Sequence, residues 1–246
     1  MLKTITTALL LFMLAPSVIF AQKSLSLSYG IPEINWDSEG NLDGLRTVNR
    51  NGWSITLSGY NIKENGVIYG FDVGVNRYGN DFQFDRMRFN LKQVHHFSIL
   101  PFIGYRHHIQ RTKFSAQANL GFGLGIVPIE NKTYQDDKNF QTIKIQDRDA
   151  NGNIIVRPIY DLTFSGTQVV KNRVFPLVKP NIELHYAVGE KSTLFVRGTL
   201  GISLIEEVIV RDFQKVVFES KEYQVNHSTS FSYWSVELGY SLNLKK

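Results

Sequence analysis

Cysteine is absent from all 246 residues, and this absence removes several kinds of chemistry at once. Disulfide bonds, thiolate metal sites and a lipid anchor on a cysteine are excluded. A long apolar stretch is also missing after the N-terminal segment. A bundle of membrane-spanning helices is therefore excluded, because each helix would need roughly 20 consecutive apolar residues.

The sequence also lacks a large excess of positive or negative charge. The chain has 27 Lys and Arg against 22 Asp and Glu, which gives a net charge of +5. This mild balance is scattered along the sequence, and we expect no nucleic-acid partner. No cofactor-binding motif is present either, and we expect no cofactor.

Residues 1–21 have the layout of a secretory signal peptide. Lys3 supplies the positive charge, a short apolar run follows, and Ala21 is the small residue before the expected cleavage site. The predicted organisation is a signal peptide over residues 1–21 and a single exported domain over residues 22–246.

The positive signal in the sequence is an alternation of apolar and polar residues with a period of two, which is typical of β-strands. It is clearest in Lys113–Pro128, where Phe and Leu alternate with Ser, Gln, Asn and Gly. About 9–11 residues of such a strand cross a bilayer at a tilt. Eight segments show the pattern: Ser24–Ile34, Gly52–Ile62, Gly66–Arg77, His96–His108, Lys113–Pro128, Val174–Val188, Ser192–Ile205 and Ser230–Leu244.

The connections between these segments alternate between short and long. The short ones are 63–65, 109–112 and 189–191, and the long ones are 35–51, 78–95, 128–173 and 206–229. Short periplasmic turns and long extracellular loops are typical of outer-membrane barrels. The fold prediction is all-β: an eight-stranded antiparallel up-and-down transmembrane β-barrel, which we expect in the outer membrane of a Gram-negative bacterium. Strand-like stretches within 128–173 predict that the barrel wall extends beyond the membrane there.

A soluble β-sandwich or a lipocalin-like barrel would show the same alternation. Two observations favour the membrane barrel, in which the bilayer is the first partner. The polar faces consist mostly of small uncharged residues, and aromatic residues near the strand ends suit a girdle at the membrane interface. The predicted girdle residues are Tyr29, Trp53, Tyr69, Tyr105, Tyr186, Trp234 and Tyr240.

Charged residues fall on the predicted inward faces. They are Asp72, Arg106, Glu183, Arg197 and Glu237. Buried acids and bases must pair. We therefore predict an ion-pair network that fills the lumen and fixes the strand register, with a proton or ion path as the functional alternative. Inward glycines indicate a narrow lumen, so a solute channel is not expected.

Two further patterns were weighed as sites. Asp147, Asp149 and Asn151 match the first half of a calcium-binding loop, but the acid required at its twelfth position is missing. A β-hairpin with an Asn-Gly turn explains the same residues. The second pattern combines a histidine, serines and an acid near the last strand: His227, Ser228, Ser230 and Glu237. Its spacing matches no acyl-hydrolase motif, so we predict no catalytic residues.

The chain resembles the eight-stranded outer-membrane barrels of Bacteroidota, the OmpA-like or PorT-like group. The resemblance is carried by Gly121, Gly123 and Gly125 and by the closing strand over residues 233–240. It implies a non-enzymatic barrel that is a structural or accessory subunit of an envelope or secretion complex. The extracellular loops, foremost 128–173, would bind protein partners. A lipid-modifying enzyme and a small-ligand or adhesion barrel remain alternatives.

Overall fold

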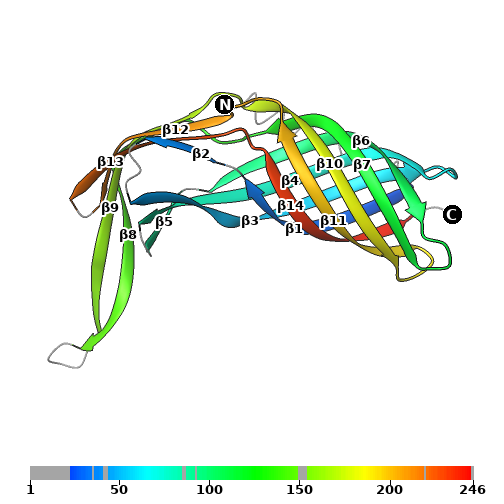
Figure 1. Cartoon of the computed structure of the whole chain (residues 1–246), viewed down its shortest axis with the longest axis horizontal. Coiled ribbons are helices and arrows are strands. Elements are labelled where there is room, and N and C mark those ends of the chain that lie inside the picture. The colour runs from blue at the N-terminus through cyan, green and yellow to red at the C-terminus, as the bar shows by residue number, and fades with distance from the viewer. Residues whose placement is uncertain are drawn as a thin grey trace.

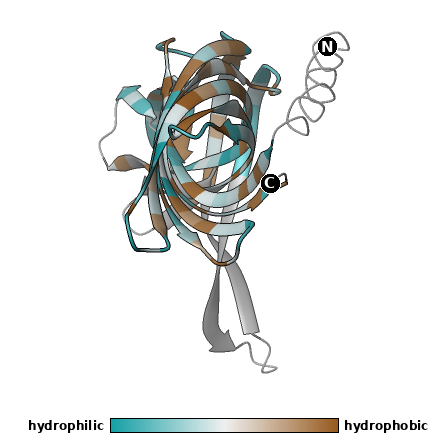
Figure 2. Cartoon of the chain, turned by 90° about the vertical axis from the view of Figure 1, so that its right-hand side faces the viewer, coloured by the Kyte–Doolittle hydropathy of each residue, from teal (hydrophilic) through white to brown (hydrophobic). Residues whose placement is uncertain are grey.

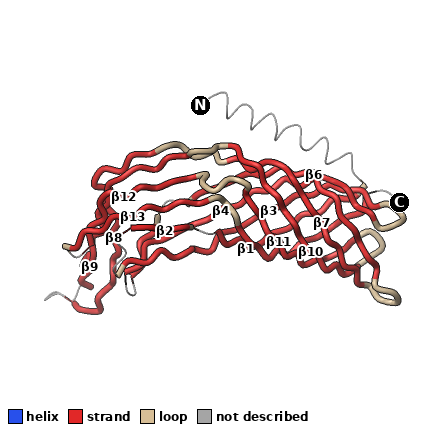
Figure 3. Tube along the Cα trace, turned by 45° about the horizontal axis from the view of Figure 1, so that its top comes forward, coloured by secondary structure: helices blue, strands red, loops and turns tan. Residues whose placement is uncertain are grey.

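The computed structural model describes residues 23–34, 36–40, 44–84, 87–91, 93–148, 154–218 and 220–244. The predicted signal peptide lies outside them. All regular elements of this part are strands (Figure 3). None of its segments forms a helix long and apolar enough to cross a membrane. The strands are β1 (Ser24–Ile34), β2 (Asp37–Gly40), β3 (Leu45–Ile62), β4 (Val67–Phe84), β5 (Met87–Asn90), β6 (Val94–His108), β7 (Phe114–Ile126), β8 (Lys132–Arg148), β9 (Ile154–Val170), β10 (Val174–Ala187), β11 (Ser192–Ser203), β12 (Ile209–Phe218), β13 (Lys221–Thr229) and β14 (Tyr233–Asn243).

Eight of these strands close into an antiparallel barrel, as predicted. The hydrogen-bonded order is β3-β1-β14-β11-β10-β7-β6-β4, and β4 pairs with β3 to complete the circle. Strands β6, β7, β10 and β11 wrap the right-hand part of Figure 1, with the C-terminus at the same end. Tight connections join β3 to β4, β6 to β7 and β10 to β11 at this end, which we call the short-turn end. The opposite end is the long-loop end.

The connection from β3 to β4 shows how a tight turn is made. The amide of Gly66 donates to the carbonyl oxygen of Lys63, and the amide of Lys63 donates to that of Val67. Gly66 has a φ of 86°, a left-handed conformation that glycine adopts without steric cost. Such a turn holds two long strands in one register.

The outer surface of the barrel is apolar from the short turns nearly to the long-loop end. Ile182 and Leu238 are 70% and 68% exposed, and the outward positions of every barrel strand repeat this character. In the described wall, the first charged outward side chains after the short turns are Glu33 and Arg77. Figure 2 shows the alternation along the strands, viewed from the short-turn end. Water-facing surfaces do not carry such a band, which is suited to hydrocarbon.

Beyond the barrel, the long connections fold into a second sheet. Its order is β2-β13-β12-β9-β8, and it lies at the left of Figure 1. Two expectations were wrong here. Residues 206–229 were expected to be a loop but form β12 and β13. The strands within 128–173 belong to this separate sheet, whereas the barrel wall is extended by β3 and β4, each 18 residues long.

The second sheet covers the extended ends of β3, β4 and β5 through an aromatic core. The rings of Phe84 and Phe218 stack with centroids 4.2 Å apart, and Phe82 contacts Phe213 at 5.3 Å. These contacts join β4 to β12 across the two layers. The cluster also contains Leu45, Phe89, Leu91, Tyr134, Leu162, Phe164, Val216, Tyr223 and Val225. The extension therefore has a hydrophobic core of its own.

Candidate functional site: the polar network in the lumen

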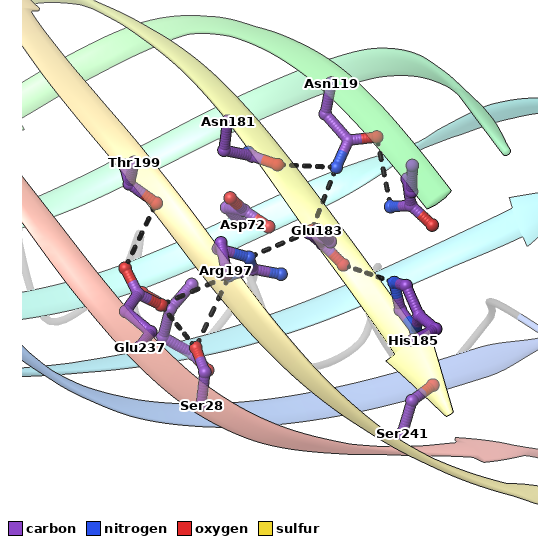
Figure 4. Close-up of polar contacts among 12 residues, drawn as sticks. Ser28, Asp72, Asn119, Asn181, Glu183, His185, Arg197, Thr199, Glu237 and Ser241 are labelled. Carbon is purple, nitrogen blue, oxygen red and sulfur yellow. Dashed lines mark hydrogen bonds and ion pairs between the residues drawn. The ribbon is translucent and has the colours of Figure 1, made fainter. Parts of the chain in front are cut away.

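The centre of the barrel lumen is a buried network around Arg197 of β11. Its Nε lies 2.9 Å from Oε1 of Glu183, and its Nη1 lies 3.4 Å from Oε2 of Glu237. All three side chains are at most 3% exposed. The strand register explains the meeting, because Arg197 is the direct partner of Glu183 on β10 and of Glu237 on β14. Figure 4 shows one guanidinium between two carboxylates.

Uncharged side chains donate further hydrogen bonds to both carboxylates. The hydroxyl of Ser28 donates to Glu237 at 2.6 Å, and Thr199 and Ser235 donate to its other oxygen. The amide of Asn119 donates to Glu183 at 3.0 Å. Figure 4 shows most of these bonds as dashed lines. A buried ion pair is stable only when its other polar atoms are also bonded, and this one meets that condition.

A second ion pair lies nearer the long-loop end. Nζ of Lys179 is 3.1 Å from Oδ2 of Asp72, with both side chains at most 4% exposed. The sequence analysis predicted Asp72 in the lumen but missed Lys179. Lys179 is an even number of residues from Asn181 and Glu183, so the alternation in the sequence already placed its side chain on the inward face of the strand. The alternation was obscured because the neighbouring inward residues Phe175 and Leu177 are apolar.

Arg106 joins the network at the short-turn end through hydrogen bonds. Its Nε donates to Gln117 at 2.7 Å, and one Nη2 contact reaches the hydroxyl of Tyr60 at 3.3 Å. The ring of His185 lies between Arg106 and Glu183, with Nε2 at 3.4 Å from the former and 2.7 Å from the latter. The five charged residues predicted for the lumen are therefore all buried there, four of them in the network around Arg197 and Asp72 in its own pair with Lys179.

Apolar side chains close the lumen above the network. Leu100, Phe175, Leu177 and Phe231 are fully buried there, within a cluster that also contains Ile34, Tyr78, Val94, Val127, Val170, Val208, Ile209 and Tyr233. Leu100 and Phe102 interrupt the polar inward face of β6, which also carries Ser98 and Arg106. The structure gives the reason, because both point inward to pack in the lumen.

Two inward glycines provide room for this packing. A Cβ atom on Gly239 would lie 2.1 Å from the ring of Phe195, and one on Gly201 would lie 2.0 Å from the ring of Tyr233. Both distances are shorter than real carbon contacts allow. The glycines therefore let large rings from neighbouring strands enter a narrow barrel.

The predicted aromatic girdle divides into three groups by height on the wall. Tyr69, Tyr105, Tyr186 and Tyr240 lie near the short turns and are 40–50% exposed. Trp53 and Trp234 lie toward the long-loop end, where Trp53 pairs with Arg77 and Trp234 with Glu33. Tyr29 belongs to neither end, because it lies in mid-strand between the exposed residues Leu27 and Ile31.

An uncharged outer band between two aromatic zones decides the class of this barrel. The chain is a transmembrane β-barrel of the outer-membrane type. No known family profile matches its sequence, and no curated protein matches it.

Solved structures with a similar shape are outer-membrane proteins. OprG from Pseudomonas aeruginosa aligns with a TM-score of 0.45 and 7% identity, over 90% of this chain and 95% of that one. Ail of Yersinia pestis aligns with a TM-score of 0.36 and 11% identity, over 90% and 99%. AlkL aligns with a TM-score of 0.37 and 14% identity, over 92% of each chain. At these scores the fold assignment rests on the strand pairing of this chain itself.

The other residues considered in the sequence as possible sites are the calcium candidates and the group around His227. Of the calcium candidates, the side chain of Asp147 and all of Asp149 and Asn151 lie outside the described part of the chain. Within that part, no group of three or more acids and histidines could hold a metal ion. His227 lies in the second sheet, whereas Glu237 lies in the lumen with Arg197 and Ser28.

A buried polar cluster that the sequence did not predict lies where the barrel meets the second sheet. The guanidinium of Arg211 lies 4.9 Å from the ring of Trp36 and donates to Gln168 at 2.9 Å. Burial lowers the pKa of Arg211 to about 10. Nδ1 of His227 lies 2.8 Å from the hydroxyl of Ser38, and burial next to Arg211 lowers the pKa of His227 to about 3. His227 is therefore neutral at ordinary pH and serves the packing of β13.

Proposed function

We propose that this protein is a non-enzymatic outer-membrane anchor whose extracellular extension binds a protein partner, as a structural or accessory subunit of an envelope or secretion complex. Export with cleavage of the segment 1–21 belongs to this proposal. The observation that carries it is the extension itself, which has its own aromatic core and ends in a projecting hairpin.

The lumen supports an anchoring role. Ion pairs occupy its centre and an apolar cluster lies above them, so the cross-section is filled by side chains. Opening a water-filled path would require buried charges to separate, which is costly. A filled barrel fixes a rigid scaffold in the membrane, and the functional surfaces then lie outside it.

The hairpin of β8 and β9 supports the choice of a protein partner. Strand β9 pairs with β12 only between Thr163 and Val170, so its outer half, Ile154–Leu162, pairs with β8 alone. This two-stranded arm projects from the body in Figure 1. Its sequence holds Phe140, Ile143, Ile145, Ile154, Ile155, Val156, Ile159 and Tyr160. A two-stranded hairpin is marginally stable by itself and gains from a partner that pairs with it.

The placement of the serine and histidine residues supports a non-enzymatic role. His227 contacts Ser38 in the second sheet, while Glu237 is held by Ser28 and Arg197 within the barrel. A nucleophile, a base and an orienting acid must lie within hydrogen-bonding reach of one another. These candidates occupy two separate regions of the molecule.

Shortening the arm tests the proposal. Asn139 and Leu162 are direct partners, so replacing residues 140–161 by Asn-Gly creates a two-residue turn between them. The matched control replaces residues 219–220 by Asn-Gly between the paired residues Phe218 and Lys221, which leaves both strands at full length.

Intact cells that carry each variant are treated with a protein crosslinker, and the barrel is purified from the membrane fraction. We expect one reproducible crosslinked protein with the natural chain and with the control, and its loss with the shortened arm. Heat-modifiable migration on a denaturing gel checks that each barrel is folded. A crosslinked set that is unchanged by shortening the arm refutes the proposal.

A further inference from the structure

A recess of about 690 Å³ lies on the outside of the barrel at the short-turn end. It is lined by the start of β1, the end of β3 and the β3–β4 turn, including Lys23, Asn61, Lys63, Glu64 and Tyr69. It lies beside the lower aromatic zone, at the level where lipid headgroups meet the wall. It is separate from the lumen network.

The strand register places three of these residues in one row. Asn61 pairs directly with Tyr69, and the amide of Lys23 donates to Oδ1 of Asn61 at 3.1 Å. Nζ of Lys63 lies 5.7 Å from the centroid of the Tyr69 ring, which directs the ammonium toward the recess. Lys23 and Lys63 therefore lie at the edge of the recess, beside the ring of Tyr69.

The wall next to this row, on the side away from the short turns, is apolar. Gly59 is the outward residue there, and its direct partners are Leu25 and Phe71. Gly59 itself is buried, so the apolar side chains around it form the lipid-facing surface that an acyl chain can contact. Charged side chains therefore lie at the short turns, and apolar side chains lie next to them toward the middle of the membrane. A phospholipid has its charged headgroup and its acyl chains in the same order.

Charge at this end of the barrel has the sign that attracts phosphate. Among the described residues of the short-turn end, the exposed cations are Lys23, Lys63, Arg111, Lys113 and Lys191, and the exposed acids are Glu64 and Glu190. Of these residues, Lys23, Lys63 and Glu64 line the recess. Lysine ammonium groups bind phosphate oxygens, and a carboxylate binds a primary ammonium.

We propose that this recess is a phospholipid site that selects a phosphoethanolamine headgroup in the periplasmic leaflet. The headgroup phosphate lies between Lys23 and Lys63, and its ammonium contacts Glu64. The side chain of Asn65 accepts from the amide of Val67 through Oδ1, so its Nδ2 group remains as a donor for the phosphate. The periplasmic assignment rests on the outer-membrane orientation in the proposed function.

The test places the full barrel in phosphatidylcholine nanodiscs that contain increasing phosphatidylethanolamine. Native mass spectrometry counts the phosphatidylethanolamine molecules that stay bound. The double variant Lys23→Gln/Lys63→Gln removes both cations of the recess. The matched control Lys113→Gln/Lys191→Gln makes the same change of charge at the other two short turns.

We expect the recess variant to bind phosphatidylethanolamine about tenfold more weakly, because two charge-assisted contacts are lost. We expect the control to bind like the natural chain. Equal losses in both variants, or no loss in either, overturn the proposal, because diffuse charge or no site would then explain the data.

Two further measurements identify the ligand. Glu64→Gln should abolish the preference for phosphatidylethanolamine over phosphatidylglycerol, and an unchanged preference contradicts the assigned role of Glu64. Inorganic phosphate and glycerophosphoethanolamine should not displace the lipid, because they lack acyl chains, and displacement would overturn the lipid as ligand. The shortened β8–β9 arm should leave lipid binding unchanged, so this inference and the proposed function fail separately.

Discussion

Removing Arg197 tests the role of the lumen network most directly. The substitution Arg197→Met keeps much of the side-chain volume but removes the cation between Glu183 and Glu237. Each carboxylate loses one charge-assisted bond, and each such bond stabilises the fold by about 1.5–3 kcal/mol. Removing one partner of a buried ion pair lowers the free energy of unfolding by about 3–5 kcal/mol in other proteins. We therefore expect the free energy of unfolding to decrease by about 4 kcal/mol.

The balance of charge predicts a rescue. Besides His185, the lumen holds the cations Arg106, Lys179 and Arg197 and the anions Asp72, Glu183 and Glu237. Arg197→Met leaves one excess negative charge in the lumen. Adding Glu183→Gln restores neutrality, and its amide can still accept from Asn119. The double variant should recover at least half of the lost stability.

Urea unfolding from lipid vesicles, followed by tryptophan fluorescence and by heat-modifiable migration, measures both variants against the natural chain. A loss below about 1 kcal/mol for Arg197→Met, the size of an exposed pair, refutes the reasoning because the network would then be solvated. A double variant that is no more stable than the single one refutes the charge balance. Barrels that fold but let ions cross planar bilayers would show that the network also seals the lumen.

The same unfolding assay checks three further expectations. Gly239→Val forces a side chain into the ring of Phe195 and should cost about 1–3 kcal/mol, whereas Gly198→Val, with no atom within 4 Å of its Cβ, should cost almost nothing. Equal effects would contradict the packed lumen. Leu238→Arg on the lipid face should cost about 2–4 kcal/mol more than Leu238→Ala, and equal values would contradict the membrane band. Because the pKa of His227 falls from 6.5 to about 3 on folding, the unfolded chain binds more protons in this range. Stability should therefore decrease as the pH falls from about 6.5 toward 3, and His227→Gln should reduce this slope; an NMR titration of His227 near its ordinary pKa would contradict its burial.

The barrel wall was predictable because each of its strands carries the information locally. A strand with lipid on one side and a filled lumen on the other must alternate, and Leu120, Phe122 and Leu124 show this without knowledge of any partner strand. Tight turns then impose the neighbour order. The positions of Asp72, Glu183 and Glu237 on inward faces follow from the same parity.

The pairing within the lumen depended on register between distant strands. Lys179 meets Asp72 across 107 residues of sequence, and no local pattern selects this partner. Arg106 was expected in an ion pair but reaches the network through Gln117 and Tyr60, because its strand places it nearer the short-turn end. Parity predicts which side chains point inward, and only the tilt and stagger of the strands decide which of them touch.

The sequence by itself determined that this protein is an eight-stranded membrane barrel with alternating short and long connections. Its period-two pattern is a direct consequence of contact with hydrocarbon. The tertiary structure alone decided that the long connections form a second sheet with an aromatic core. Short β2 becomes a strand only because Asp37 pairs with Ser228, which lies at the other end of the chain. Such strands are stabilised by packing across the layers, and that packing leaves little trace in any single segment.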